Sequence, residues 1–155
     1  MQPLADLLTP ERTASQVPGV SKKRLFETLA RLISDDQISL SYDEVLSQLV
    51  AREKLGSTGL GEGIAIPHCR IDNCSQPTGT LLTLAEPIDF DSPDNQPVDL
   101  VFALLVPAEA HQQHLETLAG LARLFSQPKF CDELRKVQGS DELFKLATQA
   151  QAVAP

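Results

Sequence analysis

Apolar residues recur at helical spacing in two segments of the first third of the chain. The segment KKRLFETLARLIS follows Ser21, and its apolar face is made of Leu25, Leu29, Leu32 and Ile33. The segment after Ser41 has Glu44 at the capping-box position and an apolar face made of Val45, Leu46, Leu49 and Val50. Serine is favoured just before a helix because its hydroxyl accepts a hydrogen bond from the first turn. The spacing predicts two amphipathic helices, the second ending near Lys54.

Three short apolar runs in the middle of the chain, at residues 64–66, 80–84 and 98–106, are bounded by Gly, Pro, Asn or Asp. This pattern is typical of strands. The last run, VDLVFALLV, is apolar at nearly every residue after Asp99, so we expect a central strand covered on both faces. The acidic segment EPIDFDSPDNQPVD before it predicts a surface connection, with or without a short hairpin strand near Ile88 and Phe90.

The helical pattern returns in the last third of the chain. From about Glu109 one face collects His114, Leu115, Leu118, Leu121, Ala122 and Phe125. Pro128 then begins a short helix, and Ser140 caps a last one. Helices thus flank a block of strands on both sides in the sequence. This order predicts an α/β fold, a mixed β-sheet with helices packed on both faces, in a single domain over residues 1–155.

Thirteen Lys and Arg residues stand against 21 Asp and Glu residues, which gives a net charge of −8. Such a charge repels nucleic acid and anionic lipid, so a basic protein partner is favoured. No apolar stretch approaches the roughly 20 residues that span a bilayer. The start, MQPLADLLTPERT, lacks the basic and apolar regions of a signal peptide. We therefore expect a cytoplasmic protein that neither binds nucleic acid nor inserts into a membrane.

The cysteines and the last two histidines bear on metal binding. Cys69, Cys74 and Cys131 form no CxxC pair, which predicts three reduced thiols rather than a zinc site. His111 and His114 are three residues apart and would suit a metal on one helix face, but no third ligand is obvious. We expect no metal and no organic cofactor, and a metal-binding or ligand-binding module using these histidines and Cys69 stays as an alternative.

The segment GSTGLGEGIAIPH, residues 56–68, has four glycines in its first eight residues. Glycine lets the backbone approach a ligand closely, and successive N–H groups in such a loop form an anion-binding concavity. The segment is not a Walker loop, because no Lys follows, and GLGEG does not complete a dinucleotide-binding fingerprint. Two interpretations stay open: a plain turn before a strand, or a phosphate-binding loop that includes Ser57, Thr58 and Gly59.

His68 ends this segment, and its imidazole suits the role of a nucleophile, base or ligand near neutral pH. A structural histidine at a strand end is the alternative. Arg52 lies four residues before Gly56 in AREKLGSTG. Its guanidinium is either a solvated group at a helix end or a ligand for a phosphoryl group at the adjacent loop.

REKLGSTGLGEGIAIPH, followed by DNQPVDLVFALLVPAEAHQQHL, resembles the enzyme IIA domain of the phosphoenolpyruvate-dependent phosphotransferase system, in the fructose/mannitol class. Within that class the chain is most similar to the nitrogen-regulatory type. The similarity spans about residues 20–147, and the pairing of IAIPH with a downstream LLVPA and HL is specific. It implies a phosphoryl carrier with a phosphohistidine intermediate.

The resemblance also implies roles for individual residues. His68, in IPH, would accept the phosphoryl group at its ε nitrogen from a histidine-containing phosphocarrier protein. His114, in HL, would be a second active-site histidine, and Arg52, in REK, would help to hold the phosphoryl group. His111 has no counterpart in the family pattern. The residue after IPH is commonly Gly in the family, whereas here it is Cys69, which either crowds the docking surface or lies buried and inert.

Docking of the carrier requires an exposed apolar patch around His68, for which we expect Leu60 and Ile64. Two uses of the phosphoryl group are open. The first is regulation by phosphorylation state, with nitrogen- or potassium-related targets such as potassium-transport components or sensor kinases implied by analogy. The second is sugar transport through an enzyme IIB permease component. The chain contains neither a permease domain nor a membrane segment, which favours regulation.

Overall fold

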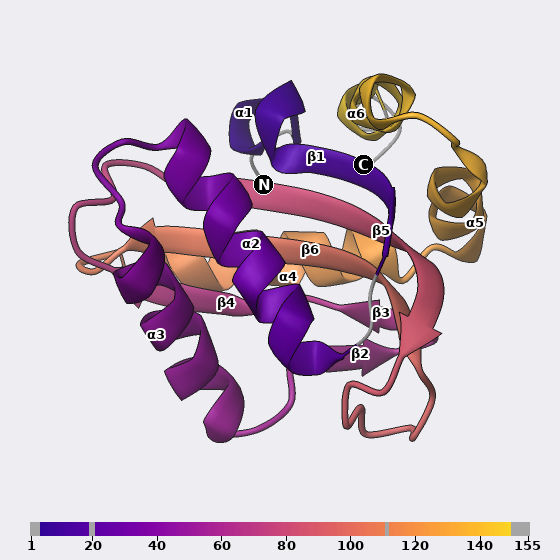
Figure 1. Cartoon of the computed structure of the whole chain (residues 1–155), viewed down its shortest axis with the longest axis horizontal. Coiled ribbons are helices and arrows are strands. Elements are labelled where there is room, and N and C mark those ends of the chain that lie inside the picture. Colours follow the sequence, from indigo (N-terminus) through magenta and orange to yellow (C-terminus); the bar gives the residue numbers. More distant parts are fainter. Residues whose placement is uncertain (1–3, 19–20, 111, 150–155) are drawn as a thin grey trace.

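The computed structural model describes residues 4–18, 21–110 and 112–149, and it has a twisted sheet with helices on both faces (Figure 1). The helices are α1 (Leu4–Leu7), the short 3-10 helix η1 (Pro10–Arg12), α2 (Lys22–Asp36), α3 (Tyr42–Lys54), α4 (Gln112–Phe125), α5 (Pro128–Lys136) and α6 (Ser140–Gln149). The strands are β1 (Thr13–Val17), β2 (Gly59–Gly61), β3 (Ile64–Ala65), β4 (His68–Ile71), β5 (Thr78–Ile88) and β6 (Val98–Pro107).

The strands of the described residues form one mixed sheet in the order β1-β5-β6-β3-β2, and β4 also pairs with β6. The β5–β6 and β2–β3 pairs are antiparallel, whereas β1 runs parallel to β5, and β3 and β4 run parallel to β6. The strand β6 therefore contacts β5 on one side and both β3 and β4 on the other. The predicted mixed sheet and its central strand at 98–106 are confirmed.

Two apolar cores lie on opposite faces of this sheet. Alternate residues of β6 enter different cores: Val101, Ala103 and Leu105 pack under α2 and α3. Leu100, Phe102 and Leu104 pack among residues of α1, α4, α5 and α6. Successive side chains of a strand point to opposite faces, so a strand buried on both faces must be apolar throughout. The predicted coverage of both faces is confirmed.

The two helices predicted in the first third of the chain are confirmed together with their caps. The Ser21 hydroxyl accepts a hydrogen bond from the Arg24 amide at 3.1 Å, and the Ser41 hydroxyl accepts one from the Glu44 amide at 3.1 Å. The helix α3 ends at Lys54, as predicted. Its last turn delivers Arg52 and Glu53 to the glycine-rich segment that follows.

One predicted detail is wrong, and one that the sequence left open is resolved. Leu115 is 61% exposed and does not belong to the buried face of α4, because Thr117 is a buried residue of that helix and Leu115 lies about 200° around the axis from it. Phe90 does not lie in a hairpin strand: β5 ends at Ile88, which pairs with Val98, and the chain then leaves the sheet. The Phe90 side chain is fully buried and stacks against Phe26 of α2.

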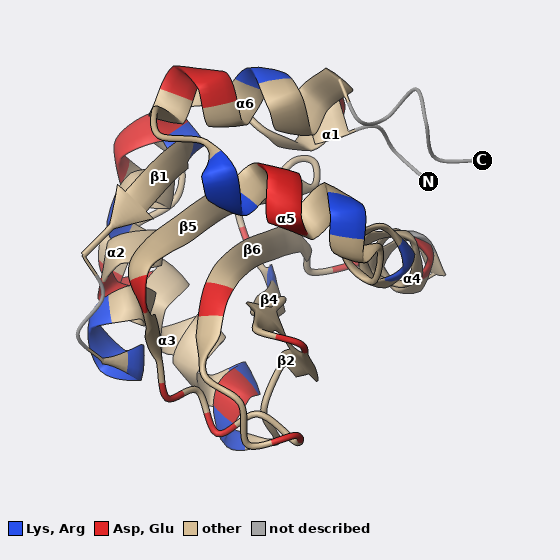
Figure 2. Ribbon diagram, turned by 90° about the vertical axis from the view of Figure 1, so that its right-hand side faces the viewer, with Lys and Arg blue, Asp and Glu red and all other residues tan. Residues whose placement is uncertain are grey.

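Charged residues are distributed over helices and loops. Basic and acidic residues follow one another along α5, and α6 has acidic residues in its first turn with a basic residue after them (Figure 2). The ribbon of β6 and β4 is mostly uncharged, in keeping with the burial of these strands. None of the described helices combines the length and the apolar composition that crossing a membrane requires.

Candidate functional site

His68 begins β4 immediately after a break in the sheet. Strands β3 and β4 both pair with β6, but the ladder is interrupted between them at Ile66 and Pro67. Proline has no N–H to donate to a ladder. Its carbonyl still accepts a hydrogen bond from the Leu104 amide at 2.8 Å, so the break is held against β6. The dipeptide Ile66-Pro67 therefore separates β3 from β4, and β4 begins at His68.

The break also places a backbone acceptor beside the imidazole. The Nδ1 atom of His68 lies 2.7 Å from the Ile66 carbonyl oxygen. A carbonyl oxygen only accepts hydrogen bonds, so Nδ1 must carry the proton. In the neutral ring this leaves Nε2 unprotonated, with its lone pair available. The Ile66 carbonyl thus fixes the tautomer of His68.

Electrostatics keep the imidazole of His68 neutral. Burial lowers its pKa from the ordinary value of 6.5, and the positive charge of Arg52 lowers it further. The hydrogen bond to Ile66 and the negative charge of Glu53 act in the opposite direction but do not cancel the effect of burial. A neutral imidazole has the free lone pair that a nucleophile needs.

His114 lies in the first turn of α4 and faces His68. The two ring centroids are 5.6 Å apart, and the ring planes are tilted by 48°. Burial, followed by the charges of His68, Arg70 and Arg52, lowers the pKa of His114. Its Nδ1 atom is buried and has no hydrogen-bond partner among the described residues. The imidazole of His114 is therefore also neutral near pH 7, and its Nδ1 atom is available for a partner that is not among the described residues.

Arg52 reaches the same place from the last turn of α3. Its Nη1 atom donates a hydrogen bond to the Gly56 carbonyl at 3.0 Å, and its charge acts on both His68 and His114. Within the described part of the chain, no carboxylate forms an ion pair with Arg52. The three residues predicted as catalytic thus lie together, although they come from α3, β4 and α4.

The predicted phosphate-binding residues 57–59 make structural contacts. The Ser57 hydroxyl donates to the Phe90 carbonyl at 3.3 Å and accepts from the Gly59 amide at 3.1 Å. The Thr58 amide and hydroxyl both donate to the Glu53 carboxylate, at 3.1 and 2.6 Å. These contacts engage both hydroxyls and the amides of Thr58 and Gly59. A phosphate-binding role for the three residues stays a prediction.

Glu53 is a functional candidate that the sequence reasoning missed. Its carboxylate lies inside the turn that it stabilises, pairs with the Lys22 ammonium at 2.8 Å, and is 8% exposed. The available signal was a carboxylate at the end of a helix, followed within five residues by a Ser-Thr pair in a glycine-rich loop. Such a loop has amide donors that need an acceptor.

The glycines of residues 56–63 are explained by a tight hairpin formed by β2 and β3. A Cβ atom on Gly59 would come within 3.0 Å of the Ser92 Cβ atom. Gly63 has φ of +81°, and a Cβ atom there would lie 2.8 Å from Nη2 of Arg135. Of the two interpretations left open, the turn before a strand accounts for these glycines.

Other expectations around His68 have mixed outcomes. Leu60 is 47% exposed, but Ile64 is only 4% exposed, so the prediction that Ile64 lies on the docking surface is wrong: its side chain belongs to the core.

Cys69 packs under α2 and α3, and burial raises the pKa of its thiol to about 12. Its side chain is therefore an inert part of the core and does not crowd the surface at His68.

Metal binding gains no support from the arrangement of the described residues. Among them, no group of three His, Cys, Asp or Glu side chains is placed to hold a metal ion. All three cysteines are free and buried. His111, a possible ligand in the metal-binding alternative, lies outside the described residues.

The fold, the two neighbouring neutral histidines and an arginine without an ion pair among the described residues define a protein suited to carrying a phosphoryl group. The family model for the phosphoenolpyruvate-dependent sugar phosphotransferase system, EIIA 2, matches residues 6–150. The chain belongs to this family, as the sequence motifs predicted. Proteins of the family are phosphotransferase components that relay a phosphoryl group through a histidine intermediate, and this relay is the function of the chain.

Individual relatives refine the comparison. The chain is 43% identical over 148 residues to a nitrogen regulatory protein of Pseudomonas aeruginosa, covering 96% of each sequence. It is 38% identical over 117 residues to a fructose-specific EIIA component of Haloferax volcanii, covering 75% of this chain and 76% of the relative. The solved structure of the nitrogen regulatory protein IIA-Ntr of Neisseria meningitidis is similar with a TM-score of 0.86 and 43% identity, covering 94% of this chain and 99% of that one.

Proposed function

We propose that His68 is the phosphoryl acceptor and that its Nε2 atom forms the bond to phosphorus. The hydrogen bond from Nδ1 to the Ile66 carbonyl carries this proposal, because it leaves the lone pair on Nε2. The donor is a phosphohistidine on a small phosphocarrier protein. As the N–P bond on the donor breaks, a new N–P bond forms at Nε2. The donor imidazole leaves with the electron pair of its bond.

Arg52 and His114 stabilise the charge of the group in transit. Phosphoryl transfer passes through a loose transition state in which negative charge spreads over three equatorial oxygens. The guanidinium of Arg52 carries a full positive charge near both rings, without a carboxylate partner among the described residues. His114 contributes a neutral ring, whose one N–H is the hydrogen-bond donor for the phosphoryl oxygens in this proposal. Groups that are already in place stabilise such charge at little reorganisation cost.

Ser57, Thr58 and Gly59 act by holding the loop between α3 and β2 in shape. Their contacts with Glu53 and Phe90 fix the turn, and the Thr58 carbonyl accepts a hydrogen bond from the Ile66 amide at 3.0 Å. Ile66 in turn holds the ring of His68. The loop is therefore linked to the acceptor through a continuous set of hydrogen bonds.

The chain uses its phosphorylation state to regulate other proteins in the cytoplasm. Relatives described as nitrogen regulatory proteins, 43% identical over nearly the full length, support a regulatory role with nitrogen-related targets. Potassium-related targets belong to the proposal by analogy alone. The net charge of −8 favours a phosphocarrier that presents basic residues, since opposite charges steer association. The single domain proposed for residues 1–155 carries the phosphoryl group.

Transfer to a sugar through an enzyme IIB component is the second candidate. The similarity to a fructose-specific EIIA component favours it, although that match covers less of the chain. Mixing the phosphorylated protein with a fructose-specific IIB and permease preparation distinguishes the two uses. Label that moves on to the sugar at a rate matching that of a sugar-specific IIA contradicts the purely regulatory role.

The acceptor is tested by incubating the protein with labelled phosphoenolpyruvate, the first enzyme of the system and its phosphocarrier. The native chain should gain acid-labile phosphate, and His68→Ala should gain none. His111→Ala is the matched control, because His111 is not among the residues proposed to act in transfer, and this variant should label like the native chain. Equal acid-labile phosphate on the native chain and on His68→Ala overturns the assignment.

A further inference from the structure

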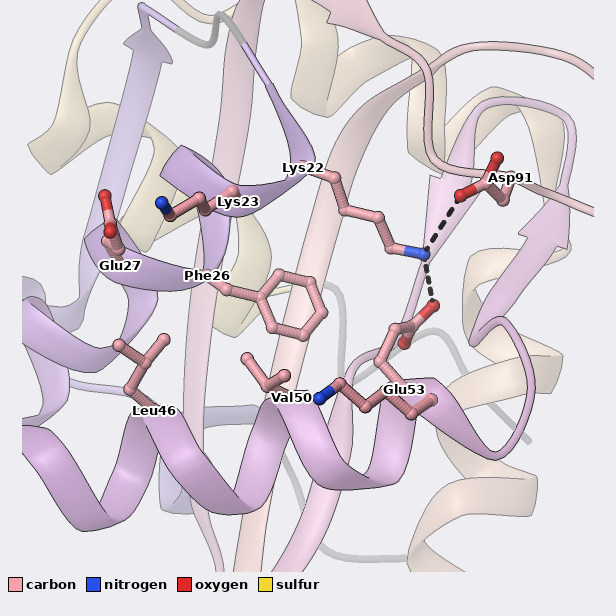
Figure 3. Close-up of a pocket in the computed structure, with 9 residues that line it drawn as sticks. Lys22, Lys23, Phe26, Glu27, Leu46, Val50, Glu53 and Asp91 are labelled. Atoms are coloured by element: carbon pink, nitrogen blue, oxygen red, sulfur yellow. Dashed lines mark ion pairs between the residues drawn. The ribbon is translucent and has the colours of Figure 1, made fainter.

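A groove with a volume of about 530 Å³ opens between the first half of α2 and residues 46–54 of α3. Its apolar lining consists of Phe26 from α2 and of Leu46 and Val50 from α3 (Figure 3). The Phe26 ring stacks against the buried Phe90 with the centroids 6.0 Å apart, so the floor of the groove is part of the core. Sites for small molecules typically enclose about 300 to 1,000 Å³ and are mostly apolar. The groove has the size and the lining of such a site.

The charged residues around the groove are Lys22, Lys23, Glu27, Glu53, Lys54 and Asp91. Lys22 closes one end, where its ammonium lies 2.8 Å from Glu53 and 3.8 Å from Asp91 (Figure 3). Glu27 pairs with Arg24 at 3.8 Å. All three acidic residues are thus in ion pairs.

Lys23 and Lys54 have no ion pair among the described residues. Lys23 comes from α2 and Lys54 from α3, so each wall of the groove contributes one unpaired cation. The chain as a whole carries a net charge of −8, and this makes two unpaired cations beside one apolar surface notable. Together they complement an anionic group attached to an apolar body.

One lining residue connects the groove with the site at His68. Glu53 faces Lys22 in the groove, while its two oxygens accept hydrogen bonds from the amide and hydroxyl of Thr58. The charge of Glu53 also acts on the His68 ring. A ligand held by Lys54, the residue next to Glu53 in α3, that displaces the Glu53 carboxylate would weaken the anchor of the loop after α3.

We propose that this groove binds a small organic anion with an aromatic or aliphatic body, and that its occupancy slows phosphoryl transfer through Glu53 and the loop. The apolar body lies on Phe26, Leu46 and Val50, and the anionic group pairs with Lys23 and Lys54. The binding goes beyond the proposed function and does not depend on it. Only the effect on transfer rests on the proposed role of His68.

Binding is tested on the protein alone by following backbone amide resonances during titration with 1-naphthoate. The matched probe is 1-naphthalenemethanol, which has the same rings and no charge. Naphthoate should cause saturable shifts at Lys23, Phe26, Val50 and Lys54, and the alcohol should bind at least fivefold more weakly. The absence of saturable shifts in the groove, or equal affinity for both probes, overturns the proposed anion site.

The two lysines are tested by substitution with glutamine. The double variant Lys23→Gln/Lys54→Gln should weaken naphthoate binding about fivefold, given the modest energy of partly exposed ion pairs. Lys129→Gln, an exposed lysine of α5 on the other face of the sheet, is the control and should bind like the native chain. Equal affinities of the double variant and the control contradict recognition by these lysines.

The coupling is tested separately from the binding. Saturating naphthoate should shift the Thr58 amide and slow phosphorylation of His68 at least twofold. A filled groove with an unmoved Thr58 amide and an unchanged rate overturns the coupling and leaves the binding intact. A chain that takes no phosphoryl group with or without naphthoate contradicts the proposed function instead, so the two failures are distinguishable.

Discussion

The strand side and the helix side of the site are built differently. On the strand side, His68 begins β4 against the central strand, and the Ile66 carbonyl fixes its ring through Nδ1. On the helix side, Arg52 and His114 extend from the end of α3 and the start of α4. Arg52 makes one hydrogen bond to the Gly56 backbone, and Nδ1 of His114 has no partner among the described residues.

The difference separates two tasks of phosphoryl transfer. The attacking atom must be aimed along one line, which suits a ring held by the backbone of a sheet. The charge on the transferred oxygens changes during the reaction, which suits side chains with unengaged donors. The comparison therefore predicts that changes on the helix side slow transfer without removing the acceptor.

The largest rate effect on the helix side is expected for Arg52. Arg52→Gln removes the positive charge and should slow phosphorylation about 100-fold, in the range seen when one preorganised donor is lost. The measurement is the rate of label incorporation from the phosphorylated carrier in rapid-quench experiments. Arg123→Gln, an exposed arginine in the last turn of α4, is the control. A loss smaller than threefold for Arg52→Gln contradicts a role in charge stabilisation.

His114 should have a smaller effect because it is a neutral donor. His114→Ala should slow transfer about tenfold, which corresponds to one uncharged hydrogen bond. His114→Gln keeps an N–H donor and should recover part of the rate. The final amount of phosphate per chain should be unchanged in both variants. A reduced final amount would mean that His114 itself accepts part of the phosphate. His114 would then be an acceptor like His68, and the helix side would not act by charge stabilisation alone.

Glu53 tests how far the loop contributes to the strand side. Glu53→Gln keeps the shape but removes the charge that accepts from Thr58 and pairs with Lys22. We expect a loss of about 1.5 to 3 kcal/mol in the free energy of unfolding and about a threefold slower transfer, a smaller rate effect than that of either catalytic candidate. Urea denaturation and rapid quench provide the two values, with the exposed Glu133→Gln as control. If Glu53→Gln has the same free energy of unfolding and the same transfer rate as the native chain, the loop does not contribute to positioning His68.

The pH dependence should be the mildest effect. Burial lowers the pKa of His68 and of His114 below 6.5, so both rings stay neutral in the folded chain as the pH falls to that value. The unfolded chain then binds protons that the folded chain does not, and the free energy of unfolding decreases below about pH 6.5. Transfer should stay level from pH 8 to pH 6.5. Ring-proton titration by NMR measures both pKa values, and a value for His68 above 6.5 disagrees with the buried neutral ring.

Periodicity and end signals predicted much of the fold. The faces and serine caps of α2 and α3 depend on nearby residues, and the unbroken apolar run of β6 requires cover on both faces. The strand β1 escaped prediction because TASQV is mostly polar, and its place depends on pairing with the distant β5. Leu115 was misassigned because spacing alone does not determine which side of a helix faces the sheet.

The sequence selected the residues of the candidate site but did not predict how they are arranged. The motif resemblance selected His68, His114 and Arg52, which lie together in the structure. The Ile66 carbonyl and the Glu53 carboxylate were not foreseen, because their roles follow from a break in a β-ladder and from the path of a turn. The direction of the backbone at a ladder break or a turn depends on pairing with distant strands, so the local residue types do not predict it.

The central claim concerns one atom, Nε2 of His68, and it is tested most directly by NMR of the phosphorylated chain labelled with ¹⁵N. Two-bond and three-bond correlations from the ring protons to the ring nitrogens distinguish phosphate on Nε2 from phosphate on Nδ1. The account predicts phosphate on Nε2 of His68, with Nδ1 still protonated and bonded to the Ile66 carbonyl. Phosphate on Nδ1, or on the ring of His114, would contradict it.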